Sequence, residues 1–229
     1  MHTRIFSALT AALIGGLFAS EAQAVPVAVS STVSLPGTTL VAEPNLAGTV
    51  LLDNLYSFNQ TLTSPTGGPE TFVGTVQERV VRETGSGTLD FYWRVMNTGT
   101  AGLDANIGDF RVGSFNIPST PVNLNYRIDG LGSVAPTSAQ RFTGSFSNYF
   151  NFIFPNGIAP GQSSNFMLAE TSATAYTQNA SFDLTNIGES QIVFTGVQVS
   201  PVPEPTELAL MLSGIGLLGF IASRRNKSA

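Results

Sequence analysis

The sequence predicts a mainly β protein that folds as an antiparallel β-sandwich. Thr, Val, Phe and Tyr are frequent from Gly48 onward, and Gly or Pro interrupts the chain about every ten residues. Before the C-terminal tail, no long stretch shows the apolar period of 3.6 residues that an amphipathic helix needs. About eight to ten short strands in one domain favour a jelly-roll-like or immunoglobulin-like sandwich, with a small barrel as the nearest alternative.

The first 24 residues have the three parts of a secretory signal peptide. Arg4 supplies the positive charge, residues 5–18 form the apolar segment, and Ala22-Gln23-Ala24 places small residues at the cleavage positions. We therefore expect a signal helix over residues 1–24, removed by cleavage after Ala24, with Ala22 and Ala24 as the residues recognised. The lead-in at 25–47 contains Pro and many small residues, so we expect it to be extended, with one edge strand.

The sandwich domain is expected over residues 48–200, and its clearest element is a hairpin over 74–97. A turn-forming loop, residues 83–87, separates two alternating runs. In the second run every other residue is a large apolar one, so this face should lie in the core. These residues are Leu89, Phe91, Trp93 and Val95.

A second hairpin is predicted over residues 180–199. Phe182 and Leu184 alternate with polar residues in its first run, and Ile192 and Phe194 do so in its second. Between the two hairpins lie four further runs of strand length, each bounded by Gly or Pro. These runs are residues 107–117, 122–129, 141–154 and 164–176.

The tail ends in a second apolar segment. Residues 208–222 are apolar except for one Ser, and at about 1.5 Å per residue they span roughly 22 Å, short of a bilayer core of roughly 30 Å. We expect a transmembrane helix over 207–223, extended by its flanking residues. Arg224, Arg225 and Lys227 should stay in the cytoplasm, which places the preceding chain outside the inner membrane.

The tail, residues 201–229, resembles the PEP-CTERM sorting signal of Gram-negative bacteria, also catalogued as the ice-binding protein C-terminal domain. The matching residues are Val202, Pro203, Glu204 and Pro205, followed by the apolar segment and the basic pair. The resemblance implies recognition and cleavage by an exosortase, and release to the cell surface or extracellular matrix. Residues 87–97 and 158–163 also resemble strands of other proteins with this signal, a group with no assigned activity.

Composition excludes whole classes of chemistry. The chain has no Cys, its one His is His2 in the leader, and its one Lys is Lys227 in the tail. A catalytic triad, a His-based zinc site and a Schiff base therefore cannot form in the body. Six arginines against twelve acidic residues give the body a formal charge of −6, which disfavours nucleic acid as a partner. We expect no enzyme activity and no obligatory cofactor.

Asp104, Asn106 and Asp109 are the candidate ligands for Ca²⁺. Carboxylate and amide oxygens suit this ion, but the spacing lacks the Gly and Glu positions of an EF-hand loop. A looser site shared with Asp129 remains an open alternative. Ordinary turn chemistry explains the same residues without a metal.

Tyr149 and Asn151 are the candidate ligand-binding residues. Phe150, Phe152 and Phe154 should face the core, which leaves Tyr149 and Asn151 outward, where they can touch a sugar ring. No regular Thr array of the kind an ice-binding face needs is visible.

The expected function is a structural or adhesive role at the cell surface or in a biofilm matrix, with exopolysaccharide as a possible partner. One alternative is a glycan hydrolase that uses two carboxylates. Glu78, Glu83 and Asp90 lie near one hairpin, although nothing in their spacing makes two of them converge. A permanently anchored protein facing the periplasm is the other alternative.

Overall fold

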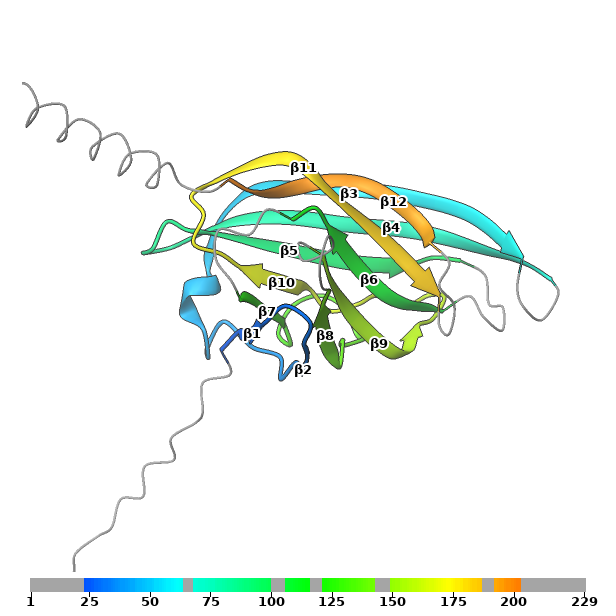
Figure 1. The fold of residues 1–229 in the computed structure, drawn as a ribbon, viewed down its shortest axis with the longest axis horizontal. Helices are drawn as coiled ribbons and strands as arrows, with labels where there is room; N and C mark the ends of the chain where they lie inside the picture. Colours follow the sequence, from blue (N-terminus) through cyan, green and yellow to red (C-terminus); the bar gives the residue numbers. More distant parts are fainter. Residues whose placement is uncertain are drawn as a thin grey trace, which may run out of the picture.

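The computed structural model describes residues 23–63, 68–99, 106–115, 121–142, 149–186 and 192–202. Within these residues the chain forms twelve strands in two sheets (Figure 1), and the strand pairings are antiparallel. The order in sheet A is β1 (Val25–Val27), β7 (Val122–Tyr126), β10 (Met167–Glu170), β5 (Leu89–Asn97), β4 (Pro69–Glu83) and β3 (Gly48–Thr63). The order in sheet B is β12 (Ile192–Val202), β11 (Ala175–Asn186), β6 (Ile107–Gly113), β9 (Phe150–Ile158), β8 (Ser138–Arg141) and β2 (Thr32–Ser34). The predicted mainly β, antiparallel class is confirmed.

Both predicted hairpins form. β4 pairs with β5 from Gly74 opposite Asn97 to Arg82 opposite Leu89, and β11 pairs with β12. The expectation that all strands are short was wrong, because β3 and β4 have 16 and 15 residues and extend along the length of the molecule (Figure 1). Ser57 and Asn59 alternate with Tyr56 and the buried Phe58, so this part of β3 has the pattern of a strand although its length was not predicted.

The lead-in contributes one strand to each sheet rather than a single edge strand. β1 lies at the edge of sheet A, where Val25 pairs with Leu124 and Val27 with Val122. β2 lies at the edge of sheet B, paired with β8. Alternation explains β1, because Val27 is fully buried between two exposed positions.

The two sheets face each other across one core. Trp93 on β5 contacts Phe110 on β6 and Phe152 on β9, with ring centroids 6.0 and 6.5 Å apart. Aromatic pairs of this kind contribute about 0.5–1.5 kcal/mol each beyond the burial of their area. The predicted core faces are confirmed, since all of their residues are 0–1% exposed. These are Leu89, Phe91, Trp93, Val95, Phe150, Phe152 and Phe154.

A loop covers part of the outer face of sheet A, away from this core. Residues 38–47 are held to the sheet by the Thr38 N–H, which donates to the Tyr126 carbonyl at 2.8 Å. This segment includes the short 3₁₀ helix η1 (Pro44–Leu46), in which Leu46 is buried. Leu46 belongs to a second apolar cluster with Val81, Tyr92, Phe166 and Leu168.

A second loop, residues 127–134, covers the neighbouring part of that face. The Arg127 N–H donates to the Phe166 carbonyl at 2.7 Å. Gly132 has a φ of +111° and lies against the Ser164 carbonyl, where a Cβ would collide. Only glycine meets both conditions, so this residue fixes how closely the loop approaches the sheet.

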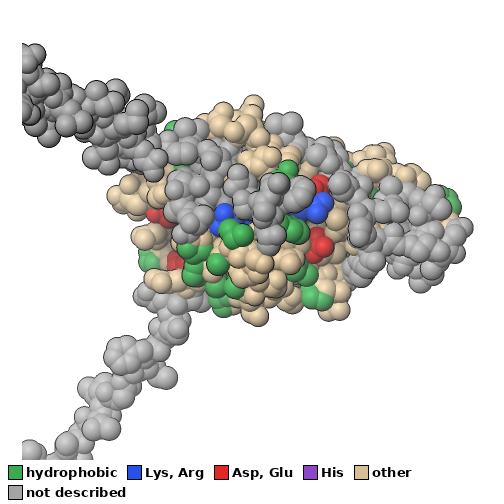
Figure 2. All heavy atoms as spheres, in the orientation of Figure 1, with side chains coloured by type: hydrophobic (Ala, Val, Ile, Leu, Met, Phe, Trp, Pro, Cys, Tyr) green, Lys and Arg blue, Asp and Glu red, His purple; other side chains and the backbone are tan. Residues whose placement is uncertain are grey.

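Charged side chains are sparse on the surface. Only 11% of residues are charged, and Figure 2 shows one face on which basic and acidic groups are few and scattered. No helix in the described part of the chain is long and apolar enough to cross a membrane. The predicted signal helix and the predicted transmembrane helix at 207–223 lie outside the described residues, apart from Gln23 and Ala24 of the leader.

Candidate functional site: two adjoining pockets

Strand β5 organises the outer face of sheet A. Its core-facing residues alternate with Asp90, Tyr92 and Arg94, which therefore point outward. The strand register places Asp90 beside Glu170 of β10, and Tyr92 beside Arg79 of β4. Directly opposite residues of antiparallel strands point to the same face, so the register builds one charged surface from three strands.

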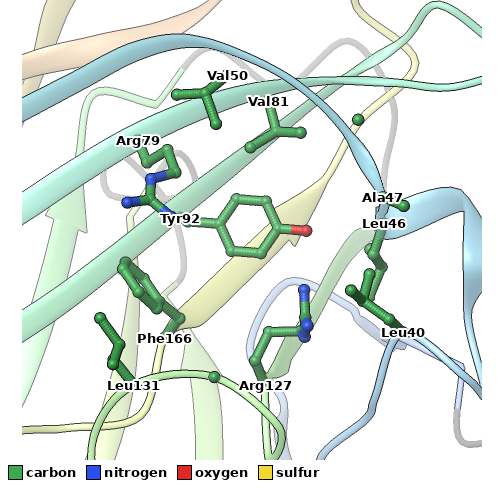
Figure 3. A pocket seen from close by; sticks show the side chains of 12 residues that line it. Leu40, Leu46, Ala47, Val50, Arg79, Val81, Tyr92, Arg127, Leu131 and Phe166 are labelled. Atoms are coloured by element: carbon green, nitrogen blue, oxygen red, sulfur yellow. The ribbon is translucent and has the colours of Figure 1, made fainter.

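The first pocket, which we call the arginine pocket, is a cavity of about 390 Å³ containing Arg79, Tyr92 and Arg127 (Figure 3). The ring of Tyr92 lies across it, with Arg79 beside Phe166 and with Arg127 near the tyrosine hydroxyl. Its walls are mostly aliphatic, and the two covering loops supply several of them. The apolar wall residues are Leu40, Leu46, Val50, Val81, Leu131 and Phe166.

Each arginine of this pocket has a carboxylate partner. Arg79 Nη2 lies 2.7 Å from Asp53 Oδ2, and Arg127 Nε lies 2.6 Å from Asp129 Oδ1. Partial burial opposes the charge of Asp53, but hydrogen bonds from Arg79 and Gln77 hold its pKa below the ordinary value. Burial likewise opposes the charge of Asp129, and its bond from Arg127 lowers the pKa overall. The protein itself therefore fixes these guanidinium groups in place.

A third arginine adds positive charge beside the pocket. The guanidinium carbons of Arg79 and Arg94 lie 5.0 and 5.3 Å from the ring centroid of Phe166. Burial, and then the charge of Arg79, lower the pKa of Arg94. Arg79 and Arg127 line the pocket and Arg94 lies beside it, and two of these three arginines are paired with Asp53 and Asp129.

Tyr92 is the buried floor of the arginine pocket. It is 4% exposed, and its hydroxyl has no hydrogen-bond partner among the described residues. Burial, and then the charge of Asp90, raise the pKa of Tyr92 well above its ordinary value. The hydroxyl points toward Arg127 (Figure 3), so the ring supports the apolar floor while its polar end lies under the guanidinium.

The second pocket, which we call the acidic pocket, is a cavity of about 300 Å³ on the other side of Leu46. Three carboxylates line it: Glu43 from the covering loop, Glu83 from the end of β4 and Glu170 from β10. Asn45 and Asn123 contribute amides, and the backbone around Gln23 and Ala24 closes one side.

The carboxylates of the acidic pocket lie against one another, Glu43 beside Glu170 and Asp90 beside Glu83. Asp90 lies on the same outer face and is fully buried, and among the described residues no salt bridge joins Asp90 or Glu43 to a cation. Burial, and then the charges of Glu83 and Glu170, raise the pKa of Asp90 to about 9. Burial, and then the charge of Glu43, raise the pKa of Glu170. These groups can ionise together only if a cation joins them.

The structure separates the three carboxylates that the sequence placed near one hairpin. Glu83 and Asp90 meet at the acidic pocket. Glu78 faces the core instead, where the Tyr56 hydroxyl donates to its Oε2 at 3.0 Å. The alternation of β4 places Glu78 on the same buried face as Val76 and Val80.

The structure describes the predicted Ca²⁺ ligands only in part, and the site stays a prediction. Asp104 lies outside the described residues, and the Asn106 amide donates to the Asn156 carbonyl at 3.3 Å. Asp109 of sheet B accepts a bond from the Thr185 hydroxyl at 3.1 Å, whereas Asp129 lies over sheet A. In the part of the chain that the structure describes, no three acidic, His or Cys side chains are arranged to hold a metal ion.

The predicted sugar-contacting residues lie on sheet B, away from both pockets. Asn151 is only 6% exposed and sits between Arg111 of β6 and Gln140 of β8. Tyr149 is half-buried and packs against Gly113. A role for Asn151 and Tyr149 in binding stays a prediction.

The predicted processing sites flank the described domain. Ala24 directly precedes β1, and Val202 is the last residue of β12, paired with Ala175. Ala22, Pro203, Glu204, Pro205, Arg224, Arg225 and Lys227 lie outside the described residues.

Apart from Glu83 and the neighbouring Asp90, named as candidate carboxylates, sequence reasoning did not select the residues of the two pockets. Alternation along β4 and β5 placed Arg79 and Tyr92 on one outer face, and that was the only available signal. Arg127 and Glu43 come from loops, and Glu170 arrives through the pairing of β10 with β5. A comparison with known proteins finds no matching family model, no matching curated protein and no matching solved structure.

Proposed function

We propose that this is an exported protein of the cell surface or extracellular matrix, and that its arginine pocket binds a carboxylate-bearing saccharide unit. The observation that carries the proposal is the pairing of fixed guanidinium groups with aliphatic and aromatic walls in one cavity. Guanidinium groups bind carboxylates through paired N–H donors, and apolar walls suit the faces of a sugar ring.

The distribution of arginines favours a single anionic group rather than an anionic polymer lying along the surface. Two of the six arginines of the body line this one pocket, whereas the body as a whole is acidic. Nucleic acid requires a continuous basic surface, which a body with six arginines in all does not supply. One uronate unit of an exopolysaccharide needs only the local site.

The cavity size agrees with this reading. About 390 Å³ lies in the usual range of roughly 300–1,000 Å³ for small-molecule pockets. A pocket of that size takes one or two sugar units and leaves the rest of a chain in solvent. Many weak contacts of this kind suit adhesion to a matrix polysaccharide, where avidity replaces single-site affinity.

The sorting half of the proposal rests on the two ends of the chain. The leader is removed after Ala24, the tail tethers the protein in the inner membrane, and an exosortase cleaves near Pro203-Glu204-Pro205. This motif begins where β12 ends at Val202, so cleavage there leaves every described strand intact. We also propose that the two sheets form a jelly-roll-like or immunoglobulin-like β-sandwich, because their aromatic side chains share one core.

Binding explains the site better than glycan hydrolysis does. The carboxylates that converge lie in the acidic pocket, and Asp90 among them has no exposed surface. A glycosidase acid must reach the glycosidic oxygen of its substrate. The arginine pocket, which is open to ligand, is lined by no carboxylate.

The binding test uses the exported protein with an oligogalacturonate and a neutral oligosaccharide of equal length. We expect calorimetric binding of the acidic oligomer alone, weakened by salt. Arg79→Gln or Arg127→Gln should weaken binding by about tenfold or more, the usual loss for a charged hydrogen bond. Arg111→Gln is the matched control, because Arg111 pairs with Asp183 at 2.8 Å on sheet B.

Two results would overturn the binding proposal. One is equal affinity for the neutral oligomer, and the other is an affinity that Arg79→Gln and Arg127→Gln leave at the level of Arg111→Gln. Release of reducing sugar by the wild-type protein would instead favour the hydrolase alternative.

The sorting test is the intact mass of the protein recovered from the cell surface or medium. A mass that lacks residues 1–24 and the residues after about Pro203 is the expected result. A mass that retains Leu208–Ala229, found only with inner membranes, would show a permanently anchored protein.

A further inference from the structure

The acidic pocket gathers several carboxylates and no cation among the residues that line it. Glu43, Glu83 and Glu170 line it, Asp90 is buried beside Glu83, and among the described residues no salt bridge joins any of these four carboxylates to a cation. Among the described residues, Arg127 is the cation whose charge acts on Glu43, and its Nε is already engaged by Asp129 on the other side of Leu46. Burial of several carboxylates without a cation is costly, so the arrangement lacks a positive partner.

The start of the folded domain lies at this pocket. Gln23 and Ala24 line it, and the backbone amide of Ala24 approaches the Glu43 carboxylate and favours its charged form. β1 holds the chain in position from Val25 onward, because Val25 pairs with Leu124. Pro26 lies opposite Asn123, which in turn lies opposite Glu170.

We propose that the N-terminal ammonium of Val25, created by cleavage after Ala24, binds in the acidic pocket and supplies its missing cation. This inference rests on the leader cleavage in the proposed function. Hydrolysis of the Ala24–Val25 bond consumes one water. Ala24 leaves with the new carboxylate, and Val25 keeps the amine, which takes up a proton.

An ammonium group fits this pocket for three reasons. It is a compact charge with three N–H donors, which matches several carboxylates in a small volume. Removal of Gln23 and Ala24 opens the side of the cavity that they now close. The Val25 nitrogen is the next backbone nitrogen after the Ala24 amide that already approaches Glu43, so the new amine is created close to that carboxylate.

Four acidic groups and one arginine act on the pocket. Glu43 from the covering loop, Glu83 from β4 and Glu170 from β10 are acidic, as is the buried Asp90 beside Glu83. Arg127 lines the arginine pocket instead, and its charge opposes the ammonium. The carboxylates outnumber it, so the bound amine keeps its proton to higher pH than a free one.

The test measures the pKa of the α-amine in the protein that has been exported with its own leader and from which the leader has been removed. Acetic anhydride labels amines in their neutral form, and Lys227 is the only other amine in the chain. Mass spectrometry of the N-terminal peptide across pH 6–10 gives the titration, with a free Val-initiated peptide as reference. An ordinary α-amine titrates at about 7.7–8.0, and we expect a shift upward by about one unit or more, so that labelling at pH 8 is several-fold slower or more.

Two changes should return the titration to that of the free peptide. Glu43→Gln with Glu170→Gln removes two carboxylates while keeping their shape, and it relieves repulsion, so the fold should persist. Insertion of one Gly between Ala24 and Val25 moves the amine outward without touching the pocket. Asp183→Asn is the matched control on sheet B and should leave the shifted titration in place.

The outcomes separate this inference from the export proposal. An N-terminal peptide that begins at Val25 but titrates like the free peptide would overturn the docking of the ammonium and leave export intact. An N-terminal peptide that begins elsewhere would refute the cleavage site, and with it this inference. A titration shift that survives both the double Gln variant and the Gly insertion also contradicts the proposal.

Discussion

The arginine pocket and the acidic pocket share one face of sheet A, with Leu46 between them, and they treat charge in opposite ways. In the arginine pocket Arg79 and Arg127 are each held by an aspartate. In the acidic pocket no salt bridge joins Asp90 or Glu43 to a cation among the described residues. The first site is organised before any partner arrives, whereas in our proposal the second is completed by the ammonium of Val25.

This difference suggests different roles. A site with fixed, paired charges binds a ligand without first reorganising, which preserves affinity. A site with buried, unpaired charges lowers stability until its partner is present, so it responds to the state of the chain. Four substitutions test this difference between the two pockets.

Trp93→Ala should destabilise the fold most, because it removes the core packing that supports both pockets. Trp93 is fully buried and contacts phenylalanines of the opposite sheet, directly beneath the strand that carries Asp90 and Tyr92. Loss of a core aromatic costs about 3–5 kcal/mol of unfolding free energy. Urea denaturation monitored by far-UV circular dichroism, a signal that does not depend on the tryptophan, measures this loss. Trp93→Phe is the milder comparison. A loss below about 1 kcal/mol for Trp93→Ala would contradict this packing.

Asp90→Asn should stabilise the protein near neutral pH. Because the folded pKa of Asp90 is raised to about 9, the native state holds a proton that the unfolded state releases above about pH 4. Stability is therefore full below pH 4 and falls as the pH rises toward 9. Asn carries no charge, so we expect a gain of about 2 kcal/mol at pH 7.

Urea denaturation at pH 5, 7 and 9 checks this prediction. The advantage of Asp90→Asn should increase with pH and should be smaller in processed protein, where the Val25 ammonium offsets the charge. A pH-independent effect, or destabilisation at pH 9, would show that Asp90 has a donor or cation of its own.

Arg127→Gln should destabilise modestly, in contrast to Asp90→Asn. The substitution removes the ion pair with Asp129, which is partly exposed, so a loss of about 0.5–1 kcal/mol is expected. Thermal unfolding in low and high salt measures it, and salt should narrow the difference from wild type. The single variant Asp129→Asn and the double variant with Arg127→Gln complete the double-mutant cycle that tests the ion pair. Full additivity of the two losses would mean that the pair contributes nothing.

Tyr92→Phe should have the smallest effect, within about 0.5 kcal/mol of wild type. The ring provides the floor of the arginine pocket, while the hydroxyl is buried without a partner among the described residues, so its removal sacrifices no hydrogen bond. Thermal unfolding and oligogalacturonate calorimetry together check this. A loss above about 1 kcal/mol would reveal a hydrogen bond to Arg127.

Local patterns predicted the structure wherever strands pair with their sequence neighbours. Alternation identified the hairpin of β4 and β5 and the buried face that contains Trp93, because side chains of a strand alternate regardless of what lies opposite. The same alternation put Asp90 and Tyr92 on the outer face. It could not show that this face is covered, since Leu46 and Glu43 come from a loop far away in sequence.

Residues brought together by long-range pairing escaped prediction. Glu170 reaches Asp90 only through the pairing of β10 with β5, which no local pattern specifies. Glu78 shows the converse, because its inward position was visible but its burial depends on the hydroxyl of Tyr56 from β3. Both pockets depend on such contacts, whereas the hairpins do not.

The placement of β1 has a consequence for the timing of biogenesis. Val25 pairs with Leu124, so β1 has no neighbour until almost a hundred further residues have crossed the membrane. Pairings so distant in sequence form late, because closing the intervening loop costs entropy that local hairpins avoid. If the protein is exported as we propose, the junction at Ala24 therefore stays extended and open to a peptidase during export, and docking of the new N-terminus becomes one of the last events in folding.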